Sequence, residues 1–97
     1  MKTFADAKFS ITKFPNPAGI VGKIELDNGN LEISIVMNEC SYGGPEGLWE
    51  IGVYEKKGDV TLPKIVKLEC LNNDVVGHLI FTELEKKIQE IQEELGL

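Results

Sequence analysis

His78 is the only histidine of the chain, and it is the residue best suited to general acid–base chemistry. Asp74 lies four residues upstream, a spacing that places two side chains on one face of a helix. Cys40 or Cys70 could add a thiol if the fold brings it close to the imidazole. A lone histidine on a short helical segment is more often a surface or packing residue. Because no GxSxG, HExxH or paired-carboxylate motif is present, we expect no catalytic residues and no enzyme.

The two cysteines lie far apart in the sequence, and neither has a histidine at metal-ligand spacing. Structural zinc sites need closely spaced cysteine and histidine ligands, so we expect no metal and no cofactor. Two reduced, half-buried thiols are the expected state, because an intracellular protein rarely carries a disulfide. Pairing of the two thiols stays open if their strands are neighbours.

The run over residues 41–51 combines a glycine cluster with the only tryptophan. Such clusters occur where the backbone takes a positive φ or approaches another group closely. The loop is either a wide connection between strands or a site that presents backbone amides and side chains, and it lacks the lysine of a phosphate loop. We expect Trp49 to be buried. The predicted binding residues are Tyr42, Gly43, Gly44, Glu46, Trp49 and Tyr54.

The composition is that of a folded acidic protein of 97 residues, with 42% hydrophobic and 27% charged residues. This length predicts a single domain, residues 1–97, with one modest core. The net charge is −6 and every basic residue is a lysine. Arginine makes the bidentate contacts to phosphates and base edges, so we expect no direct nucleic-acid binding. No apolar signal region or membrane-length segment is present, so we expect a cytoplasmic protein without a membrane partner.

The clearest structural signal is a β-hairpin over residues 22–37. Apolar and polar residues alternate before and after residues 27–30, and the Asn28-Gly29 dipeptide favours the positive φ angles of a hairpin turn. Residues 4–14 and 48–55 also alternate and predict two more strands. Because one side of these strands is apolar, the sheet is expected to be antiparallel and covered on one face.

The second half of the chain predicts a turn, an interrupted strand and a helical segment. The turn falls at residues 56–59, and residues 60–70 resemble a strand that Pro63 interrupts. Residues 71–74 predict another turn, which caps a short helix over residues 75–79.

The chain is expected to end in a helix that begins at about Thr82, where Glu85 completes a capping box, and ends at Gly96. Its narrow apolar stripe could pack on the sheet or against a second copy of the chain. The stripe comprises Leu84, Ile88, Ile91 and Leu95. The predicted fold is α+β, with a four- or five-stranded antiparallel sheet, a short helical segment and a C-terminal helix on one face.

Two short motifs resemble a pattern of small uncharacterised proteins from tailed bacteriophages and prophages. They are Ser41-Tyr42-Gly43-Gly44 with Gly47-Leu48-Trp49-Glu50-Ile51-Gly52-Val53, and Asn73-Asp74-Val75-Val76-Gly77-His78-Leu79. The resemblance covers residues 30–95 and omits the N-terminal strand. The chain departs from the pattern between residues 61 and 71 and adds Ile80 and Phe81. The resemblance implies a phage origin and the cytoplasm of an infected bacterium, and it implies no activity.

Three functional hypotheses follow. The first is an accessory protein that binds a protein partner or forms a homodimer, with Tyr42, Trp49 and Tyr54 as contact residues, because aromatic residues dominate hot spots. The second is an acidic inhibitor that mimics nucleic acid on a host enzyme, which requires a continuous negative stripe. The third is a small-molecule binder or minor enzyme, which requires Cys40, Tyr42 and His78 to converge on one pocket.

Overall fold

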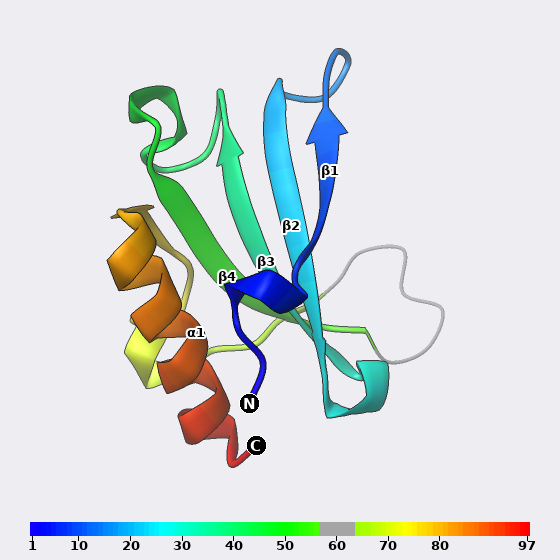
Figure 1. The fold of residues 1–97 in the computed structure, drawn as a ribbon, viewed down its shortest axis with the longest axis vertical. Coiled ribbons are helices and arrows are strands. Elements are labelled where there is room, and N and C mark those ends of the chain that lie inside the picture. Colours follow the sequence, from blue (N-terminus) through cyan, green and yellow to red (C-terminus); the bar gives the residue numbers. More distant parts are fainter. Residues whose placement is uncertain (57–63) are drawn as a thin grey trace.

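The computed structural model describes residues 1–56 and 64–97 and shows an α+β fold (Figure 1). Within these residues, one antiparallel sheet has the order β1-β2-β3-β4-β5, and β6 also pairs with β4. The strands are β1 (Lys8–Thr12), β2 (Gly19–Leu26), β3 (Leu31–Asn38), β4 (Trp49–Glu55), β5 (Lys64–Ile65) and β6 (Val76–Leu79). The helices are α1 (Phe81–Leu95) and the 3-10 helices η1 (Phe4–Asp6), η2 (Asp27–Gly29), η3 (Gly44–Glu46) and η4 (Glu69–Leu71). The predicted fold class is confirmed, with six strands instead of four or five.

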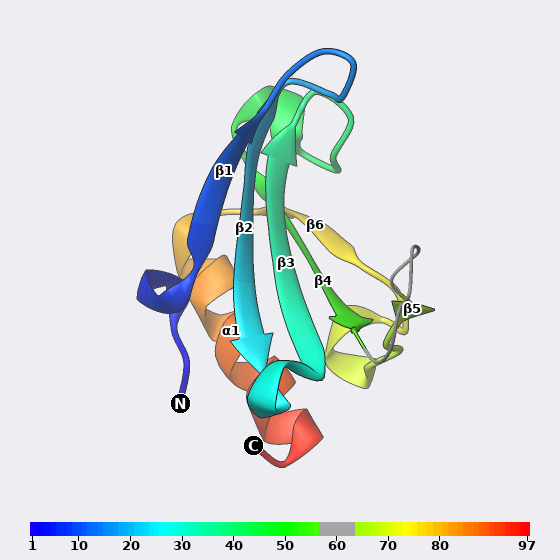
Figure 2. The same cartoon turned by 90° about the vertical axis from the view of Figure 1, so that its right-hand side faces the viewer.

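β2 and β3 form the predicted hairpin (Figure 2). Leu26 lies opposite Leu31, so the connection comprises residues 27–30 and is longer than a two-residue turn. Asn28 and Gly29 have φ angles of 55° and 86°, which are the positive values that this dipeptide favours. The hairpin therefore forms for the reason that its sequence indicates.

α1 packs its apolar stripe on one side of the sheet, which we call the inner face. The fully buried side chains of the inner face come from β2, β3 and β4, and those of the helix meet them in one cluster. They include Ile24, Ile33, Ile35, Ile51 and Val53 from the strands and Leu84, Ile88 and Ile91 from α1. The predicted packing of the terminal helix on its own sheet is confirmed.

The ends of α1 follow different rules. Gly96 ends the helix with a φ of 74°, and its amide N–H donates to the carbonyl of Glu93, as predicted for a glycine at this position. The capping box predicted at Thr82 is wrong, because the helix begins one residue earlier. The backbone N–H of Ile80 donates to Glu83 Oε1 at 3.0 Å and takes the place of that box.

The helix predicted over residues 75–79 is also wrong, because this segment is strand β6. Asn72 and Asn73 have positive φ angles of 54° and 61°, and His78 has one of 57°. A positive φ cannot continue a right-handed helix, so the chain turns and pairs with β4, where Leu79 lies opposite Trp49. β6 is the strand that the sequence-based count omits.

Two other predicted segments differ from the structure. The first strand is shorter than residues 4–14, because Phe4–Asp6 form η1, which is closed by a hydrogen bond from Thr3 N to Asp6 Oδ2. Residues 57–63, which hold most of the predicted turn at 56–59 and the start of the predicted strand at 60–70, lie outside the described residues. From residue 64 onward the strand is only Lys64–Ile65, and η4 follows it.

Candidate functional site

The inner face of the sheet extends beyond the part that α1 covers. In Figure 1 the helix lies on the β4 side of the sheet, and β1 lies at the opposite side. Phe9 pairs with Gly22 and Ile11 pairs with Ile20, so these side chains point to the inner face together. Phe9 is 44% exposed, Ile20 39% and Ile11 83%. The apolar inner face is therefore open to solvent along β1.

This open region forms a groove with a volume of about 660 Å³. Its lining comes from η1, β1, β2 and the start of β4, and we call it the aromatic groove. The lining residues are Phe4, Phe9, Ser10, Ile11, Ile20 and Trp49. All but Ser10 have apolar or aromatic side chains, so the groove offers hydrophobic contact with little hydrogen bonding.

The aromatic rings of the groove pack around Phe4. The centroid of the Phe4 ring lies 5.2 Å from Phe9, 5.7 Å from Trp49 and 5.0 Å from Phe81. The contacts with Trp49 and Phe81 are edge-to-face, with interplanar angles of 74° and 79°. Aromatic pairs favour this arrangement over a face-to-face stack. The rings thus hold one another in place at the edge of the groove.

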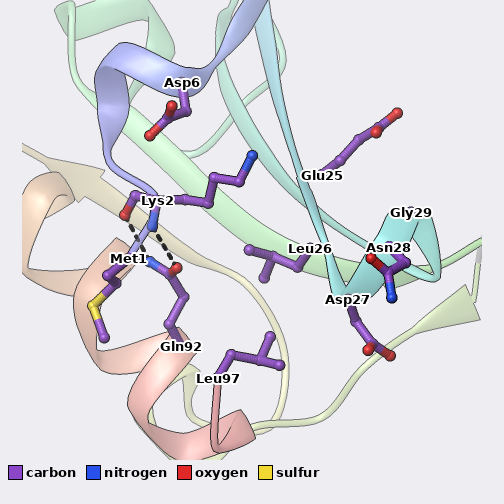
Figure 3. A pocket seen from close by; sticks show the side chains of 10 residues that line it. All are labelled: Met1, Lys2, Asp6, Glu25, Leu26, Asp27, Asn28, Gly29, Gln92 and Leu97. Atoms are coloured by element: carbon purple, nitrogen blue, oxygen red, sulfur yellow. Dashed lines mark hydrogen bonds between the residues drawn. The ribbon is translucent and has the colours of Figure 1, made fainter.

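Two side chains of α1 fix Phe4 in this position. The amide of Gln92 is buried; its Nε2 donates to the carbonyl of Lys2 at 2.7 Å, and its Oε1 accepts from Lys2 N at 2.8 Å (Figure 3). Glu85 Oε1 accepts from the backbone N–H of Phe4 at 3.3 Å. The N-terminal segment is therefore attached to the helix at two points, and it carries Phe4 over Trp49.

Gly22 sets the depth of the groove. A Cβ atom at this position would lie 2.5 Å from Cε1 of Phe9, closer than real carbon contacts allow. The absence of a side chain at Gly22 lets the Phe9 ring lie against the backbone of β2.

A second cavity of about 730 Å³ lies between the N-terminus, the β2–β3 connection and the end of α1 (Figure 3). Its charged groups are of both signs, with Lys2 beside Asp6, Glu25 and Asp27. Its most directional group, the amide of Gln92, is already bonded to Lys2. The Gln92 amide is therefore not free to bind a ligand in this cavity.

The loop over residues 41–47 is packed closely against β6. The backbone N–H of His78 donates to the carbonyl of Tyr42 at 2.9 Å, and Tyr42 N donates to Glu50 Oε2 at 2.8 Å. A Cβ at Gly43 would lie 2.8 Å from Cα of His78, and one at Gly77 would collide with Tyr42. Gly43 and Gly44 of this loop thus serve internal packing, whereas a Cβ at Gly47 would have no neighbour within 4 Å.

The predicted binding residues do not share one surface. Trp49 is partly buried and lines the aromatic groove, whereas Tyr54 lies on the opposite, outer face of β4, as the alternation of the strand requires. Burial, and then the nearby carboxylates of Glu50 and Asp74, raise the pKa of Tyr54. Tyr42 is 63% exposed in the loop. The remaining predicted residues, Gly43, Gly44 and Glu46, belong to the same loop and its helix η3.

Of the residues considered for catalysis, His78 and Tyr42 are in backbone contact, but neither of the described cavities joins them with Cys40. Asp74 and His78 do not share a helix, because β6 replaces it. Both cysteines are free thiols, and Cys40 is exposed. Neither Cys40 nor His78 lines either of the two cavities described above.

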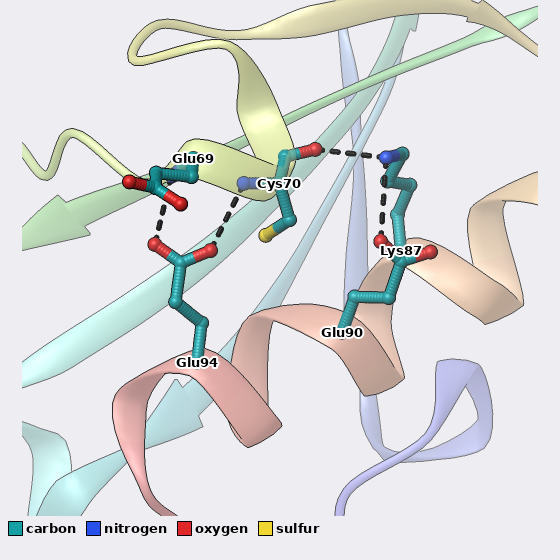
Figure 4. Close-up of polar contacts among 5 residues, drawn as sticks. All are labelled: Glu69, Cys70, Lys87, Glu90 and Glu94. Atoms are coloured by element: carbon teal, nitrogen blue, oxygen red, sulfur yellow. Dashed lines mark hydrogen bonds and ion pairs between the residues drawn. The ribbon is translucent and has the colours of Figure 1, made fainter.

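Cys70 lies in a polar contact between η4 and α1 (Figure 4). The carboxylate of Glu94 accepts from the backbone N–H groups of Glu69 at 2.7 Å and Cys70 at 2.9 Å, while Lys87 Nζ donates to the carbonyl of Cys70 at 2.8 Å. Burial, followed by the hydrogen bond to Glu94, raises the pKa of the Cys70 thiol to about 11. The thiol is therefore protonated at neutral pH, and a protonated thiol is a poor nucleophile.

Many acidic side chains bind the protein's own backbone. Carboxylates that accept a backbone N–H are Asp6, Glu39, Glu50, Glu83, Glu85 and Glu94. Part of the acidity of the chain thus has an internal structural role. This weakens the argument from acidity for an inhibitor that mimics nucleic acid. Among residues 1–56 and 64–97, no group of three or more histidine, cysteine or acidic residues could hold a metal ion. In the same residues no helix has the length and apolar character needed to cross a membrane.

Sequence reasoning missed most of the aromatic groove. The alternation of Phe9 and Ile11 places both on one side of a strand, which is the only local signal that points to it. Nothing in that alternation says that α1 packs at the β4 end of the same face and leaves Phe9 and Ile11 uncovered. A comparison of the chain with protein-family models, curated proteins and solved structures finds no match.

Proposed function

We propose that this chain is a non-enzymatic accessory protein that acts by binding another protein chain through the aromatic groove. The observation that carries the proposal is the exposure of Phe9, Ile11 and Ile20 on the inner face, beside the part that α1 covers. A sheet normally buries its apolar face under a second layer. A contiguous exposed apolar surface on a small protein marks an interaction site.

The chemistry of the groove suits a protein partner better than a small polar molecule. Its lining residues are apolar or aromatic except Ser10, whose side chain points to the outer face of the sheet. Small-molecule sites add several convergent polar groups that fix the orientation of the ligand. In contrast, protein interfaces obtain most of their binding energy from a few aromatic anchors, and Trp49 and Phe9 are of that type.

The groove is also preorganised. Gln92 and Glu85 hold the N-terminal segment, and Phe4 packs edge-to-face on Trp49 before any partner arrives. Side chains that are ordered in the free protein lose little conformational entropy when a partner binds. A preformed aromatic surface therefore supports binding without a conformational change.

The resemblance to small tailed-phage proteins supplies a biological setting for this proposal. The partner that this setting implies is a protein in the cytoplasm of an infected bacterial cell. The genes beside the coding sequence test that origin directly, because phage accessory genes lie among other phage genes.

A photo-reactive phenylalanine analogue at position 11 tests the proposed binding site. Ile11 is 83% exposed, so the replacement leaves the core intact, and the exposed Gln89 on α1 is the matched control position. In cells that naturally carry the gene, we expect a discrete cross-linked protein from position 11 and none from position 89. The substitution Phe9→Ser should strongly reduce the product. Equal cross-linking at both positions, or no product at either, contradicts the proposed function.

A further inference from the structure

β1 is an edge strand of the sheet with a regular ladder on one side only. Within the described residues it pairs with β2 alone, and all of its residues except Thr12 are exposed. The free side of an edge strand presents unpaired N–H and C=O groups that can pair with another strand. Lys8–Thr12 contains no proline and its register with β2 has no bulge, so neither of these features blocks such pairing.

The register of β1 decides which side chains of an added strand would enter the aromatic groove. Phe9 and Ile11 point to the inner face, whereas Lys8, Ser10 and Thr12 point to the outer face. Residues that pair directly across two strands share a face. Partner side chains opposite Phe9 and Ile11 would therefore extend the apolar groove, and the one opposite Lys8 would lie on the outer face.

The outer face carries two pairs of like charges, and within the described residues only one of them has a counter-charge nearby. Glu25 pairs with Glu32 across β2 and β3, and Lys56 Nζ lies 3.8 Å and 3.4 Å from their carboxylates and compensates them. Lys8 pairs with Lys23 across β1 and β2, and both side chains are exposed. In the described part of the chain, neither lysine forms an ion pair. Like charges directly opposite each other are destabilising, so a carboxylate beside Lys8 would relieve the repulsion.

We propose that the free edge of β1 binds an extended protein segment in which acidic and apolar residues alternate. Its apolar residues lie opposite Phe9 and Ile11 and continue the aromatic groove, and a carboxylate lies beside Lys8 and Lys23. Main-chain hydrogen bonds to β1 supply affinity, and the alternating side chains supply specificity. This inference rests on the proposed function, because the segment belongs to the protein that the groove binds.

A second copy of the chain fits this edge less well. If two β1 strands pair antiparallel about Ser10, Lys8 of each copy faces Thr12 of the other, and neither Lys8–Lys23 pair gains a counter-charge. The pairing instead brings two basic pairs onto one outer face, where they repel. Charge complementarity thus favours an acidic partner over self-association.

The test is a titration of the isotope-labelled full-length protein with a capped peptide of about seven residues that alternates glutamate with valine or isoleucine. We expect amide shifts in Lys8–Thr12 and at the Trp49 indole. The double variant Lys8→Glu with Lys23→Glu keeps a like-charge pair, so its fold is unchanged, but it should bind this peptide about tenfold more weakly. It should in turn bind the peptide with lysine in place of glutamate. The control variant Lys67→Glu with Lys86→Glu has the same net charge as the first double variant. It should bind the acidic peptide as tightly as the wild-type protein does.

Several results overturn the inference. In the titration, these are the absence of amide shifts in β1, equal affinity for the acidic and basic peptides, or an equal loss of peptide affinity in the two double variants. A dimer with protected β1 amides in the absence of peptide would also contradict it. So would binding to anionic vesicles without binding to the peptide. Cross-linking at position 11 separates this failure from that of the proposed function. If the cross-linked protein forms but the peptide prediction fails, only the extended acidic segment is wrong. If position 11 also gives no product, the proposed function fails with it.

Discussion

The aromatic groove and the loop over residues 41–47 use conspicuous residues in opposite ways. In the loop, Gly43 and Gly44 let the backbone pack within a few ångströms of His78 and Asn38. These two glycines therefore serve contacts within the protein. In the groove, Ile11 is 83% exposed, and Phe9 remains 44% exposed although its ring packs on Phe4. The comparison shows that an unusual sequence motif can mark tight packing, whereas an exposed apolar surface can consist of ordinary strand residues that remain uncovered.

The comparison predicts that the loop is sensitive to the addition of a single methyl group. A Cβ at Gly44 would collide with the carbonyl oxygen of Asn38 and with Ser41 Oγ. We expect Gly44→Ala to lower the free energy of unfolding by about 3 kcal/mol, because overpacked backbone must shift. Gly47 has a φ of 77° and no neighbour within 4 Å, so Gly47→Ala should cost only about 1 kcal/mol. Urea unfolding followed by Trp49 fluorescence measures both, and equal losses would show that the loop is not tightly packed.

The position of Phe4 in the groove should depend on Gln92, which lies outside the groove. Gln92→Met keeps the length of the side chain but removes its hydrogen bonds to Lys2 and Ile88. We expect a loss of about 2 kcal/mol and weaker near-ultraviolet circular dichroism, because Phe4 is no longer held against Trp49. The exposed Gln89 provides the control, and Gln89→Met should leave both signals unchanged. A normal aromatic spectrum for Gln92→Met would mean that ring packing and the Glu85 hydrogen bond hold Phe4 without Gln92.

A second clamp from α1, Glu94, differs from Gln92 because it is charged and its effect depends on pH. The backbone N–H groups of Cys70 and then Glu69 lower the pKa of Glu94 below its ordinary value of 4.5. A lowered pKa in the folded state stabilises the protein fully above pH 4.5, and the stabilisation disappears as the pH falls through the folded-state pKa. The difference in Tm between wild type and Glu94→Gln should therefore be constant at neutral pH and shrink in acid. Glu93→Gln is the neighbouring control, and a difference that grows in acid would contradict the clamp.

The smallest effect on stability is expected in the groove itself. Ile11 is 83% exposed, so Ile11→Ser should change the free energy of unfolding by no more than about 0.5 kcal/mol. The same substitution should weaken the binding of any protein that occupies the groove. Chemical unfolding and the binding assay are measured on one preparation. A loss of stability as large as that of Gly44→Ala would show that Ile11 is covered in the native protein.

The parts of the fold that local chemistry controls could be predicted from the sequence. The positive φ angles at Asn28 and Gly29 define the hairpin, and the spacing of Leu84, Ile88 and Ile91 identifies the buried face of α1. These features depend on a few neighbouring residues, and no distant contact overrides them.

The rest depends on contacts between distant segments. β6 resembles a helix in sequence, but the turn before it and its ladder with β4 make it a strand. The groove depends on which part of the sheet α1 packs against. It also depends on Gln92 and Glu85, which bind the N-terminal segment from the other end of the chain. Such long-range placement cannot be seen in local alternation or helical periodicity, so the sequence indicated Trp49 but not the surface around it.

The exposure of the inner face along β1 can be measured directly by methyl NMR with a soluble paramagnetic agent at low protein concentration. The groove predicts strong relaxation enhancement for the methyl groups of Ile11 and Ile20 and almost none for those of Ile24 and Ile33, which are completely buried on the same face. Protection of Ile11 and Ile20 in the monomer, at the level of Ile24 and Ile33, would contradict an open groove.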